Sequence, residues 1–283
     1  MVRITTRAGI FAVALFVFIG AQTAFANTII DLKTGATNVS NTAKIGGTFI
    51  VGETNTQPTG TGYIDSFLRI QQDGSERGFN TNAKPVPLDD KSGNFTHSLL
   101  LSDIGTITVG GNVYYHFVLD INQNGTNLLS LNQVQIFRGS SDPASYTLTE
   151  AAAGSASLIS LAGDTEVFRM NNTGDSNAFE IQMDYSINSG SGSGDIDFLV
   201  SKSYIDSHGS GNYITLYSQF GSPNGAYSSN DGFEEWWNIR STPCTDFTTC
   251  NPQSEMPEPS SVLLLGSGLV GLALAARKRS SKK

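Results

Sequence analysis

Short stretches in which apolar and polar residues alternate recur between Asn27 and about Phe247. In the clearest of them, 179–187 (FEIQMDYSI), every second residue is apolar or aromatic and the residues between them are polar. A period of two is typical of a β-strand that buries one face and exposes the other. Helical periodicity is almost absent from the same region, so the pattern predicts a protein built mainly from strands.

A second pair of strands is predicted over 113–137. Apolar and aromatic residues occupy every second position of 115–121, and 128–137 (LLSLNQVQIF) forms the next apolar segment. Asn124-Gly125 lies between the two segments, and both residues tolerate the positive φ of a tight turn. We therefore expect the two segments to form a β-hairpin.

Further strand candidates follow along the chain, separated by Gly, Asn, Ser, Thr and Asp. They cover 45–51, 63–71, 95–101, 104–109, 195–201 and 213–220. About ten short strands joined by polar turns predict an all-β fold, a two-sheet β-sandwich of jelly-roll-like type. Two segments are less regular: 151–161 fits either a short helix or a loop, and the glycine-rich 189–194 is interpreted as a loop within the domain.

The first residues, 1–26, have the three parts of a secretory signal peptide. Two arginines precede an apolar run at 10–19 (IFAVALFVFI), which is too short to span a bilayer comfortably. Ala24 and Ala26 place small residues where signal peptidase reads them, so we expect cleavage before Asn27. The mature chain is then exported through the Sec translocon; the alternative is an uncleaved anchor.

The C-terminal segment also has the features of a targeting segment. A Pro-Glu-Pro tripeptide is followed by an apolar run over 261–276 and a basic tail over 277–283. The run approaches the ~20 residues of a transmembrane helix, and its basic tail predicts that this end stays in the cytoplasm. The residues that carry the pattern are Pro257, Glu258, Pro259, Arg277, Lys278 and Arg279.

This order of features resembles the PEP-CTERM sorting signal of exopolysaccharide-producing bacteria, from Pro257 to about Arg279. Met256 stands where Val is the usual neighbour of the first proline. The resemblance implies recognition by an exosortase, a membrane transpeptidase that removes the helix and the basic tail near the Pro-Glu-Pro. It therefore implies a transient membrane anchor, followed by release to, or attachment at, the cell surface or extracellular matrix.

The body of the chain also resembles a recurring, uncharacterised ectodomain type of PEP-CTERM proteins. The similar segments are 60–71, 78–81, 95–104, 117–122, 130–137, 190–195 and 232–237. The resemblance implies one β-sandwich over about 28–238 and carries no known activity. The domain organisation that we expect is a signal peptide at 1–26, an ectodomain at 27–247, a linker at 248–256 and a sorting signal at 257–283.

One loop has half of a calcium-binding pattern. Asp120, Asn122 and Asn124 place oxygen-bearing side chains at alternate positions before a glycine, and hard cations need several such oxygens. The second half fails, because Leu131 stands where a calcium loop has its bidentate glutamate. A hairpin turn explains the same residues without a metal, so calcium remains an alternative.

A second candidate site combines acidic and aromatic residues. Asp231 and Glu234 precede Trp236 and Trp237, and an exposed indole could stack on a sugar ring while the carboxylates bind its hydroxyls. The alternative is that the two indoles alternate along the last strand, with one in the core and one outside. Both interpretations stay open at this stage.

Catalytic motifs are not found in the sequence. It contains neither a G-x-S-x-G elbow nor a phosphate loop, and its three histidines stand in unrelated contexts. A glycosidase needs two carboxylates across a cleft, and the sequence does not show which pair would meet. We therefore expect no enzyme.

Cys244 and Cys250 are expected to form a disulfide in an oxidising compartment.

The charged residues are distributed unevenly along the chain. The formal net charge is −8, but 27–276 contains ten Lys and Arg against 25 Asp and Glu, which gives −15. An acidic ectodomain argues against nucleic acid and favours neutral or cation-bridged glycans over acidic ones. We expect a structural or glycan-binding component of the exopolysaccharide or biofilm matrix. The alternatives are an extracellular polysaccharide hydrolase or lyase, and a calcium-stabilised adhesion module.

Overall fold

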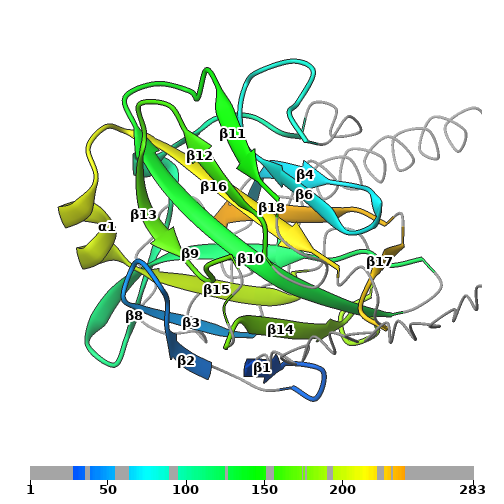
Figure 1. Cartoon of the computed structure of the whole chain (residues 1–283). Helices are drawn as coiled ribbons and strands as arrows, with labels where there is room; N and C mark the ends of the chain where they lie inside the picture. Colours follow the sequence, from blue (N-terminus) through cyan, green and yellow to red (C-terminus); the bar gives the residue numbers. More distant parts are fainter. Residues whose placement is uncertain are drawn as a thin grey trace, which may run out of the picture.

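The structure is a computed structural model that describes residues 28–35, 39–54, 64–88, 95–124, 127–150, 156–173, 175, 177–189, 194–221, 226–230 and 232–239 (Figure 1). These residues form many short strands, two principal sheets and a single α-helix. The prediction of an all-β fold is therefore confirmed.

The first sheet lies in front in Figure 1. Its strands, in spatial order, are β1 (Thr28–Asp31), β14 (Phe179–Asp184), β10 (Leu128–Gly139), β16 (Tyr213–Phe220) and β6 (Glu76–Phe79). Two further strands join it, β13 (Thr165–Arg169) beside β10 and β7 (Leu99–Leu100) beside β16. β1 runs parallel to β14, while β10 is antiparallel to β13, β14 and β16.

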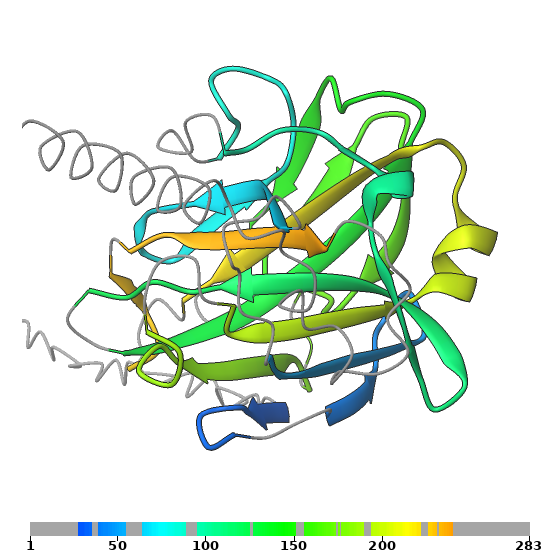
Figure 2. The same ribbon diagram turned by 180° about the vertical axis from the view of Figure 1, so that it is seen from behind.

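The second sheet lies in front in Figure 2. Its strands, in spatial order, are β2 (Val39–Thr42), β3 (Thr48–Glu53), β15 (Ile196–Ser201), β9 (Asn112–Asp120), β18 (Glu234–Ile239) and β4 (Ile64–Ile70). β8 (Thr106–Val109) forms a hairpin with β9 and pairs with the first residues of that strand. The pairs along this sheet are antiparallel, and apart from β2–β3 and β8–β9 they join strands that are far apart in the sequence.

Smaller elements surround the two sheets. β11 (Tyr146–Thr149) pairs with β12 (Leu158–Leu161), and β5 (Asp73–Gly74) pairs with β17 (Ser229–Asn230). A 3₁₀-helix, η1 (Leu101–Asp103), follows β7, and α1 (Lys202–His208) follows β15 directly. In both ribbon views α1 lies at one end of the two sheets (Figures 1 and 2).

The main hydrophobic core lies between the sheets, which makes the fold a sandwich. Val134 on β10 and Phe117 on β9 belong to one continuous buried cluster, although their strands are in different sheets. Across the same interface Phe168 of β13 meets Phe198 of β15, with ring centroids 5.7 Å apart and an edge-to-face geometry. Alternate residues of each strand thus face a shared interior, as the period of two predicts.

The β11–β12 hairpin covers part of the outer face of the first sheet. Ile159 and Leu161 pack there against Phe137 and Tyr217 in a separate buried cluster. The hairpin is also held by polar contacts, because the Gln135 amide accepts from the Ile159 N–H at 2.9 Å and donates to the Ile159 carbonyl at 3.2 Å. A buried glutamine satisfied in this way fixes the register of the hairpin on the sheet.

The predicted hairpin at Asn124-Gly125 is wrong. β9 and β10 do not pair: β9 pairs with β8, β15 and β18, whereas β10 pairs with β13, β14 and β16. The chain crosses from one sheet to the other between Asp120 and Leu128. Two segments with one apolar face each can bury those faces across a sandwich as well as side by side, and the sequence signal does not distinguish the two arrangements.

Other elements differ from the sequence pattern. The ambiguous segment 151–161 ends in the strand β12, and only Leu99–Leu100 of the predicted strand 95–101 is extended in a sheet. The helix α1 is not predicted at all, because its seven residues are too few to show a helical period. Its local signal is Ser201, whose hydroxyl accepts from the Tyr204 N–H at 3.4 Å as an N-cap.

Several predicted features lie outside the described residues. They are the signal peptide 1–26 with Ala24, Ala26 and Asn27, the cysteines Cys244 and Cys250, the linker 248–256, and the sorting signal 257–283. Within the part of the chain that the structure does describe, no helix is long and apolar enough to cross a membrane.

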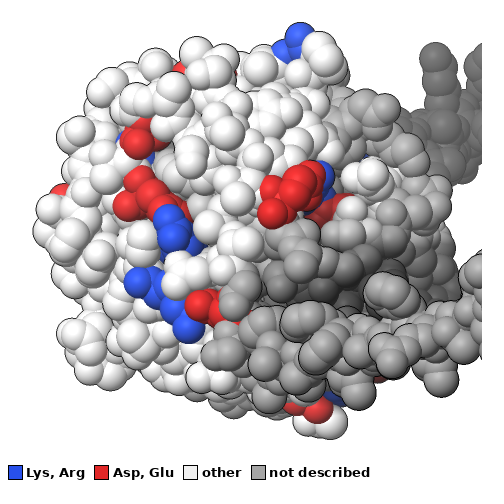
Figure 3. All heavy atoms as spheres, in the orientation of Figure 1, with Lys and Arg blue, Asp and Glu red and all other residues white. Residues whose placement is uncertain are grey.

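The charged surface is made of small mixed groups. On the face that Figure 3 shows, Lys and Arg atoms lie next to Asp and Glu atoms, and uncharged residues separate these groups. Arg77 and Glu150 are an ion pair among the described residues, with 2.6 Å between Nη2 and Oε1. The described part of this face therefore has no broad patch of one sign.

Candidate functional site

A groove of about 1000 Å³ opens beside α1, where η1, the first residues of β9, the end of β10 and the start of β16 meet. Its apolar lining includes Leu100, Leu101 and Ile104, and its accessible aromatic ring is that of Tyr213, because Tyr115 is 4% exposed. Its volume is at the upper end of the range for small-molecule sites, which is about 300–1000 Å³. Among the described residues this groove is the best candidate for a functional site.

One wall of the groove comes from the short pairing of β7 with β16. Tyr213 stands opposite Leu100 in that pairing, and the Leu101 N–H donates to the Asn212 carbonyl at 2.8 Å. Opposite residues in an antiparallel pair point to the same face. Leu100 and Tyr213 therefore form adjacent parts of one surface, and both keep part of their side chains exposed.

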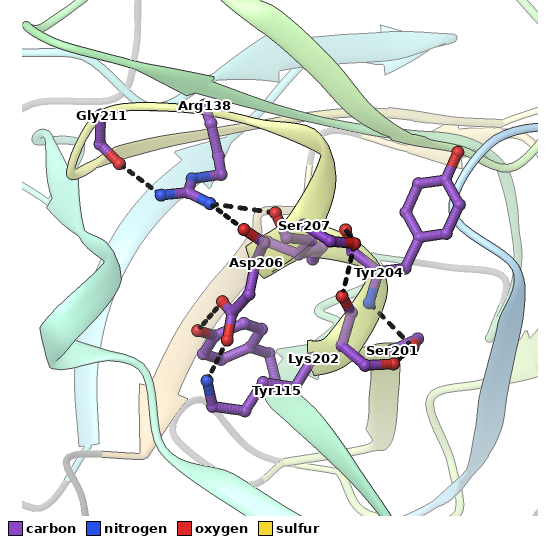
Figure 4. A network of polar contacts seen from close by, with 10 residues as sticks. Tyr115, Arg138, Ser201, Lys202, Tyr204, Asp206, Ser207 and Gly211 are labelled. Carbon is purple, nitrogen blue, oxygen red and sulfur yellow. Dashed lines mark hydrogen bonds and ion pairs between the residues drawn. The ribbon is translucent and has the colours of Figure 1, made fainter.

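Arg138, at the end of β10, fixes α1 at the edge of the groove. Its Nη1 donates to the carbonyls of Ile205 and Asp206 at 3.0 and 3.3 Å, and its Nη2 donates to the Gly211 carbonyl at 2.8 Å (Figure 4). These oxygens belong to the last turn of α1 and the loop behind it, where carbonyls have no partner within the helix. The guanidinium also complements the negative end of the helix dipole.

A second polar network joins α1 to β9. The Tyr115 hydroxyl donates to Asp206 Oδ1 at 2.7 Å, and the Lys202 ammonium donates to the other oxygen of the same carboxylate (Figure 4). Lys202 lies one helical turn before Asp206, so the helix itself brings the two charges together. The ammonium also lies 5.0 Å from the centre of the Tyr115 ring.

Protonation states in this network follow from its geometry. Burial by itself raises the pKa of Asp206, but the hydrogen bonds from Lys202 and Tyr115 outweigh it, and the pKa lies below its ordinary value. The hydrogen bond to Asp206 raises the pKa of Lys202, and burial followed by the bond to Asp206 raises the pKa of Tyr115. At neutral pH the groove thus holds a carboxylate, an ammonium and a neutral phenol.

The chemistry of this groove suits binding. It offers hydrogen-bonding groups on a partly apolar, partly aromatic surface, as sites for polar small molecules do. Among the described residues that line it, Asp206 is the single carboxylate, whereas glycoside hydrolysis generally uses two. Tyr115 is a poor general base, because its pKa is raised and its proton is held by Asp206.

The predicted sugar platform at Trp236 and Trp237 is not at the surface. Trp236 is fully buried in the main core, and Trp237 is 3% exposed in a separate cluster with Val118 and Ile239. The two indoles do alternate along β18, but each lies in its own buried cluster, so neither is available to a ligand. This correction extends to Glu234, which is also fully buried; Asp231 lies outside the described residues.

The predicted calcium ligands do not form a cluster of free oxygens. Asp120 is buried, and the amide nitrogen of Asn122, rather than its oxygen, faces it at 3.5 Å. Asn124 uses its backbone N–H to bind the side chain of Asn230. No group of three or more His, Cys, Asp or Glu within the described ranges is arranged to hold a metal ion.

Buried acids from different strands gather near this crossover. Asp195 is 5% exposed, and burial raises its pKa to about 8, with smaller contributions from the charges of Asp120 and Glu53. Glu234 has a pKa well above its ordinary value because it is buried and because it shares a hydrogen bond with Glu76. Sequence distance hides such groups, since they come from different strands.

His116 has a structural partner. Its Nε2 lies 2.6 Å from Asp197 Oδ1, and both side chains are buried on the same face of the second sheet. His116 is therefore a strand residue whose side chain has a buried polar partner. The groove residues Arg138, Lys202 and Asp206 were missed, because a two-turn helix and a strand end give no recognisable motif.

Comparison with known proteins identifies a sorting signal at the C-terminal end of the sequence. The PEP-CTERM protein-sorting motif matches residues 257–279. The chain therefore carries the sorting signal of exported proteins that are processed by an exosortase, and the predicted resemblance of this segment is confirmed. No curated protein and no solved structure matches the chain significantly.

Proposed function

We propose that the chain is an exported component of the cell surface or exopolysaccharide matrix that binds a glycan in the groove beside α1. The destination is supported by the sorting motif. The ligand class is supported by one observation, a groove in which Tyr213 and Leu100 adjoin Asn212, Lys202 and Asp206. Sugars present apolar ring faces and many hydroxyls, so they suit a surface with both kinds of group.

The ionic groups of the groove favour a ligand with hydroxyls. The Asp206 carboxylate already has two donors, from Tyr115 and Lys202, and retains acceptor capacity for a further donor. Lys202 has three ammonium protons and can donate to a sugar oxygen as well. A fixed carboxylate–ammonium pair can thus serve as both acceptor and donor without a change in protonation.

Binding is preferred to catalysis for two reasons. The described lining contains one carboxylate, and the only lining residues of β9 and α1 that could act as a base are engaged with one another. A lyase or hydrolase remains the alternative. It predicts that a bound polysaccharide is shortened with time, which reducing-end and ultraviolet assays would detect.

The test is a glycan array probed with the full-length chain in a mild detergent, followed by titration of the best ligand. We expect Tyr213→Ala and Lys202→Ala to weaken binding by at least about tenfold, since each removes a direct contact. Tyr146→Ala is the matched control, because Tyr146 is a partly exposed tyrosine on β11 and is not part of the groove. Unchanged binding by both groove variants, at unchanged stability, would refute the site.

A further inference from the structure

A small cavity lies between the two sheets, beside the ends of β3 and β14. Its volume is about 10 Å³, and its apolar lining includes Leu32 and Ile121. Three acids, Glu53, Asp184 and Asp195, also line it. A space of this size holds one water molecule at most, so a carboxylate that faces it loses most of the solvation that bulk water provides.

Asp195 and Glu53 each have an oxygen without a partner at this cavity. Asp195 Oδ1 and Glu53 Oε1 are inaccessible to solvent and make no hydrogen bond. Asp195 is 5% exposed as a whole. A buried carboxylate without donors is costly, and two of them beside one cavity also repel each other. A proton on one of them removes a charge and turns an unpaired acceptor into a donor.

The charged groups around Asp195 are acids. Glu53 at the end of β3 and Asp184 at the end of β14 line the cavity with it, and the charge of Asp120 acts on it from the end of β9. No Lys, Arg or His among the described residues lines the cavity. Asp184 differs from the other acids, because its carboxylate accepts from the Ser186 N–H at 2.9 Å and from the Ser186 hydroxyl at 2.7 Å.

Lys33 follows the lining residue Leu32 in the chain, but its charge is used elsewhere. Its ammonium donates to the side chains of Gln182 and Tyr227, and it lies 3.3 Å from a carboxylate oxygen of Asp31. It is not one of the residues that line the cavity. Within the described part of the chain, the acids around Asp195 are therefore not balanced by a neighbouring cation.

Asp195 holds three segments together at this position. Its N–H donates to the Leu119 carbonyl at 2.9 Å, and its carbonyl accepts from the Thr54 N–H at 3.0 Å, which extends the pairing of β15 with β9 and β3. Its Oδ2 accepts from the Ile121 N–H at 2.8 Å. Ile121 begins the crossover from the second sheet to the first, so this one side chain ties the crossover to the second sheet.

We propose that Asp195 is a proton-dependent latch, which holds the crossover at Ile121 closed while its carboxyl group is protonated and releases it when the group ionises. The ionised group would face other acids without a cation, so its charge is accommodated only when water enters between β3, β15 and the crossover. The pKa of Asp195, which burial raises to about 8, agrees with this geometry. The latch goes beyond the proposed glycan groove, with which it shares no described lining residue.

The latch opens as the pH rises. In the open state the carboxyl group is in water and ionises near its ordinary pKa of 3.8, whereas the closed state keeps the proton up to about pH 8. Opening between these two values therefore releases one proton, and the open population should rise about tenfold per pH unit. Above about pH 8 both states are ionised, so the open population no longer depends on pH.

The experiment measures hydrogen exchange of the Ile121 and Thr54 amides between about pH 5 and pH 8, in the full-length chain in a mild detergent. Base catalysis alone speeds exchange about tenfold per pH unit, and a linked proton release adds about another tenfold. We therefore expect an increase of about a hundredfold per pH unit in the wild type. Asp195→Asn should show only about tenfold, because its amide imitates the protonated acid and does not ionise.

Asp184→Asn is the matched control, because it changes an acid of the same cavity that already has its donors from Ser186. It should keep the wild-type pH dependence. A direct measurement covers the case in which Asp195→Asn does not fold: in the wild type with isotope-labelled aspartate, the Asp195 carboxyl carbon should titrate near pH 8 by NMR.

Four results would overturn the proposal. The first is wild-type exchange of Ile121 and Thr54 that rises only about tenfold per pH unit, as base catalysis alone requires. The second is a dependence in Asp195→Asn as steep as in the wild type, and the third is its loss in Asp184→Asn. The fourth is an Asp195 carboxyl group that titrates near its ordinary pKa of 3.8.

Discussion

The indole Nε1 of Trp236, on β18 of the second sheet, donates to Ser218 Oγ, on β16 of the first sheet, at 3.0 Å. Both residues are fully buried, and the indole also makes an edge-to-face contact with Phe198 at 5.8 Å. A buried indole N–H needs an acceptor. This hydrogen bond therefore joins the two sheets within the core.

Substitution of either partner of this hydrogen bond should destabilise the fold, and the effects of the two substitutions should not be additive. Ser218→Ala leaves the indole N–H unpaired and should lower the free energy of unfolding by about 1–3 kcal/mol. Trp236→Phe removes the donor and leaves a cavity, at a cost of about 2–4 kcal/mol. The double variant should lose less than the sum, because Phe needs no acceptor. Urea denaturation of all four chains measures the coupling, and strictly additive losses would disprove the bond.

Gly211 should tolerate no side chain. Its φ is +95°, and a Cβ would lie 2.0 Å from the Gly139 carbonyl oxygen. Gly163 has a similar φ of +87°, but a Cβ there would meet no atom within 4 Å. Gly163→Ala should therefore cost about 1 kcal/mol, from backbone strain alone. Gly211→Ala should cost at least about 3 kcal/mol, since backbone atoms must also move.

The same pair of variants tests the link between this loop and the groove. Gly211→Ala displaces the carbonyl that binds Arg138, so glycan binding in the groove should weaken along with stability. Gly163→Ala should leave binding unchanged. Thermal melting and the glycan titration together check this expectation, and equal losses in the two variants would show that the close contact with Gly139 is unimportant.

Stability should depend on pH through Glu234. Burial raises the pKa of Glu234, and the hydrogen bond with Glu76 raises it further, so the folded chain keeps a proton that the unfolded chain releases near pH 4.5. The stability that this proton supplies is complete below about pH 4.5 and declines as the pH rises toward the pKa of the folded state. The native state should therefore lose stability between pH 4.5 and 7.5 on this account.

Glu234→Gln removes that dependence. The amide keeps an oxygen that can accept from the Gln123 side chain, which donates to Glu234 at 2.9 Å, and it offers an N–H to Glu76. The variant should be more stable than the wild type at pH 7.5, and the difference should shrink toward pH 4.5. Urea midpoints across this range measure it, with Asp103→Asn as the exposed control. Parallel curves for wild type and Glu234→Gln would contradict the shift.

The sorting motif predicts a processed C-terminus. In a host with the matching exosortase, mass spectrometry of the surface protein should find a chain that ends near Pro257-Glu258-Pro259 and lacks the basic residues 277–283. Glu258→Ala should leave the chain in the membrane fraction with its tail attached. Recovery of wild-type protein outside the inner membrane with an intact tail would contradict processing.

Some features of the fold could be predicted because they are local. The alternation in 179–187 places Ile181 and Met183 in the core, and 113–121 places Phe117 and Leu119 there as well. A period of two needs only neighbouring residues to be seen, and strand faces follow from it directly. The sorting motif is also contiguous, so the destination of the protein could be predicted from the sequence alone.

Tertiary structure decided how the strands pair and which side chains meet. The turn signal at Asn124 marks a reversal of the chain, but the reversal leads into the opposite sheet, because apolar faces can be buried across a sandwich. The groove depends on Arg138 and Asp206, which are far apart in the sequence.

The sequence by itself therefore determined the secondary-structure class, the acidic ectodomain and the sorting address, since each depends on composition or on contiguous residues. It did not determine the site. Trp236 carries the most suggestive side chain for sugar binding, yet the structure buries it, because its face of β18 packs into the core between the two sheets. Exposure and proximity depend on how the two sheets pack, and that arrangement exists only in the folded chain.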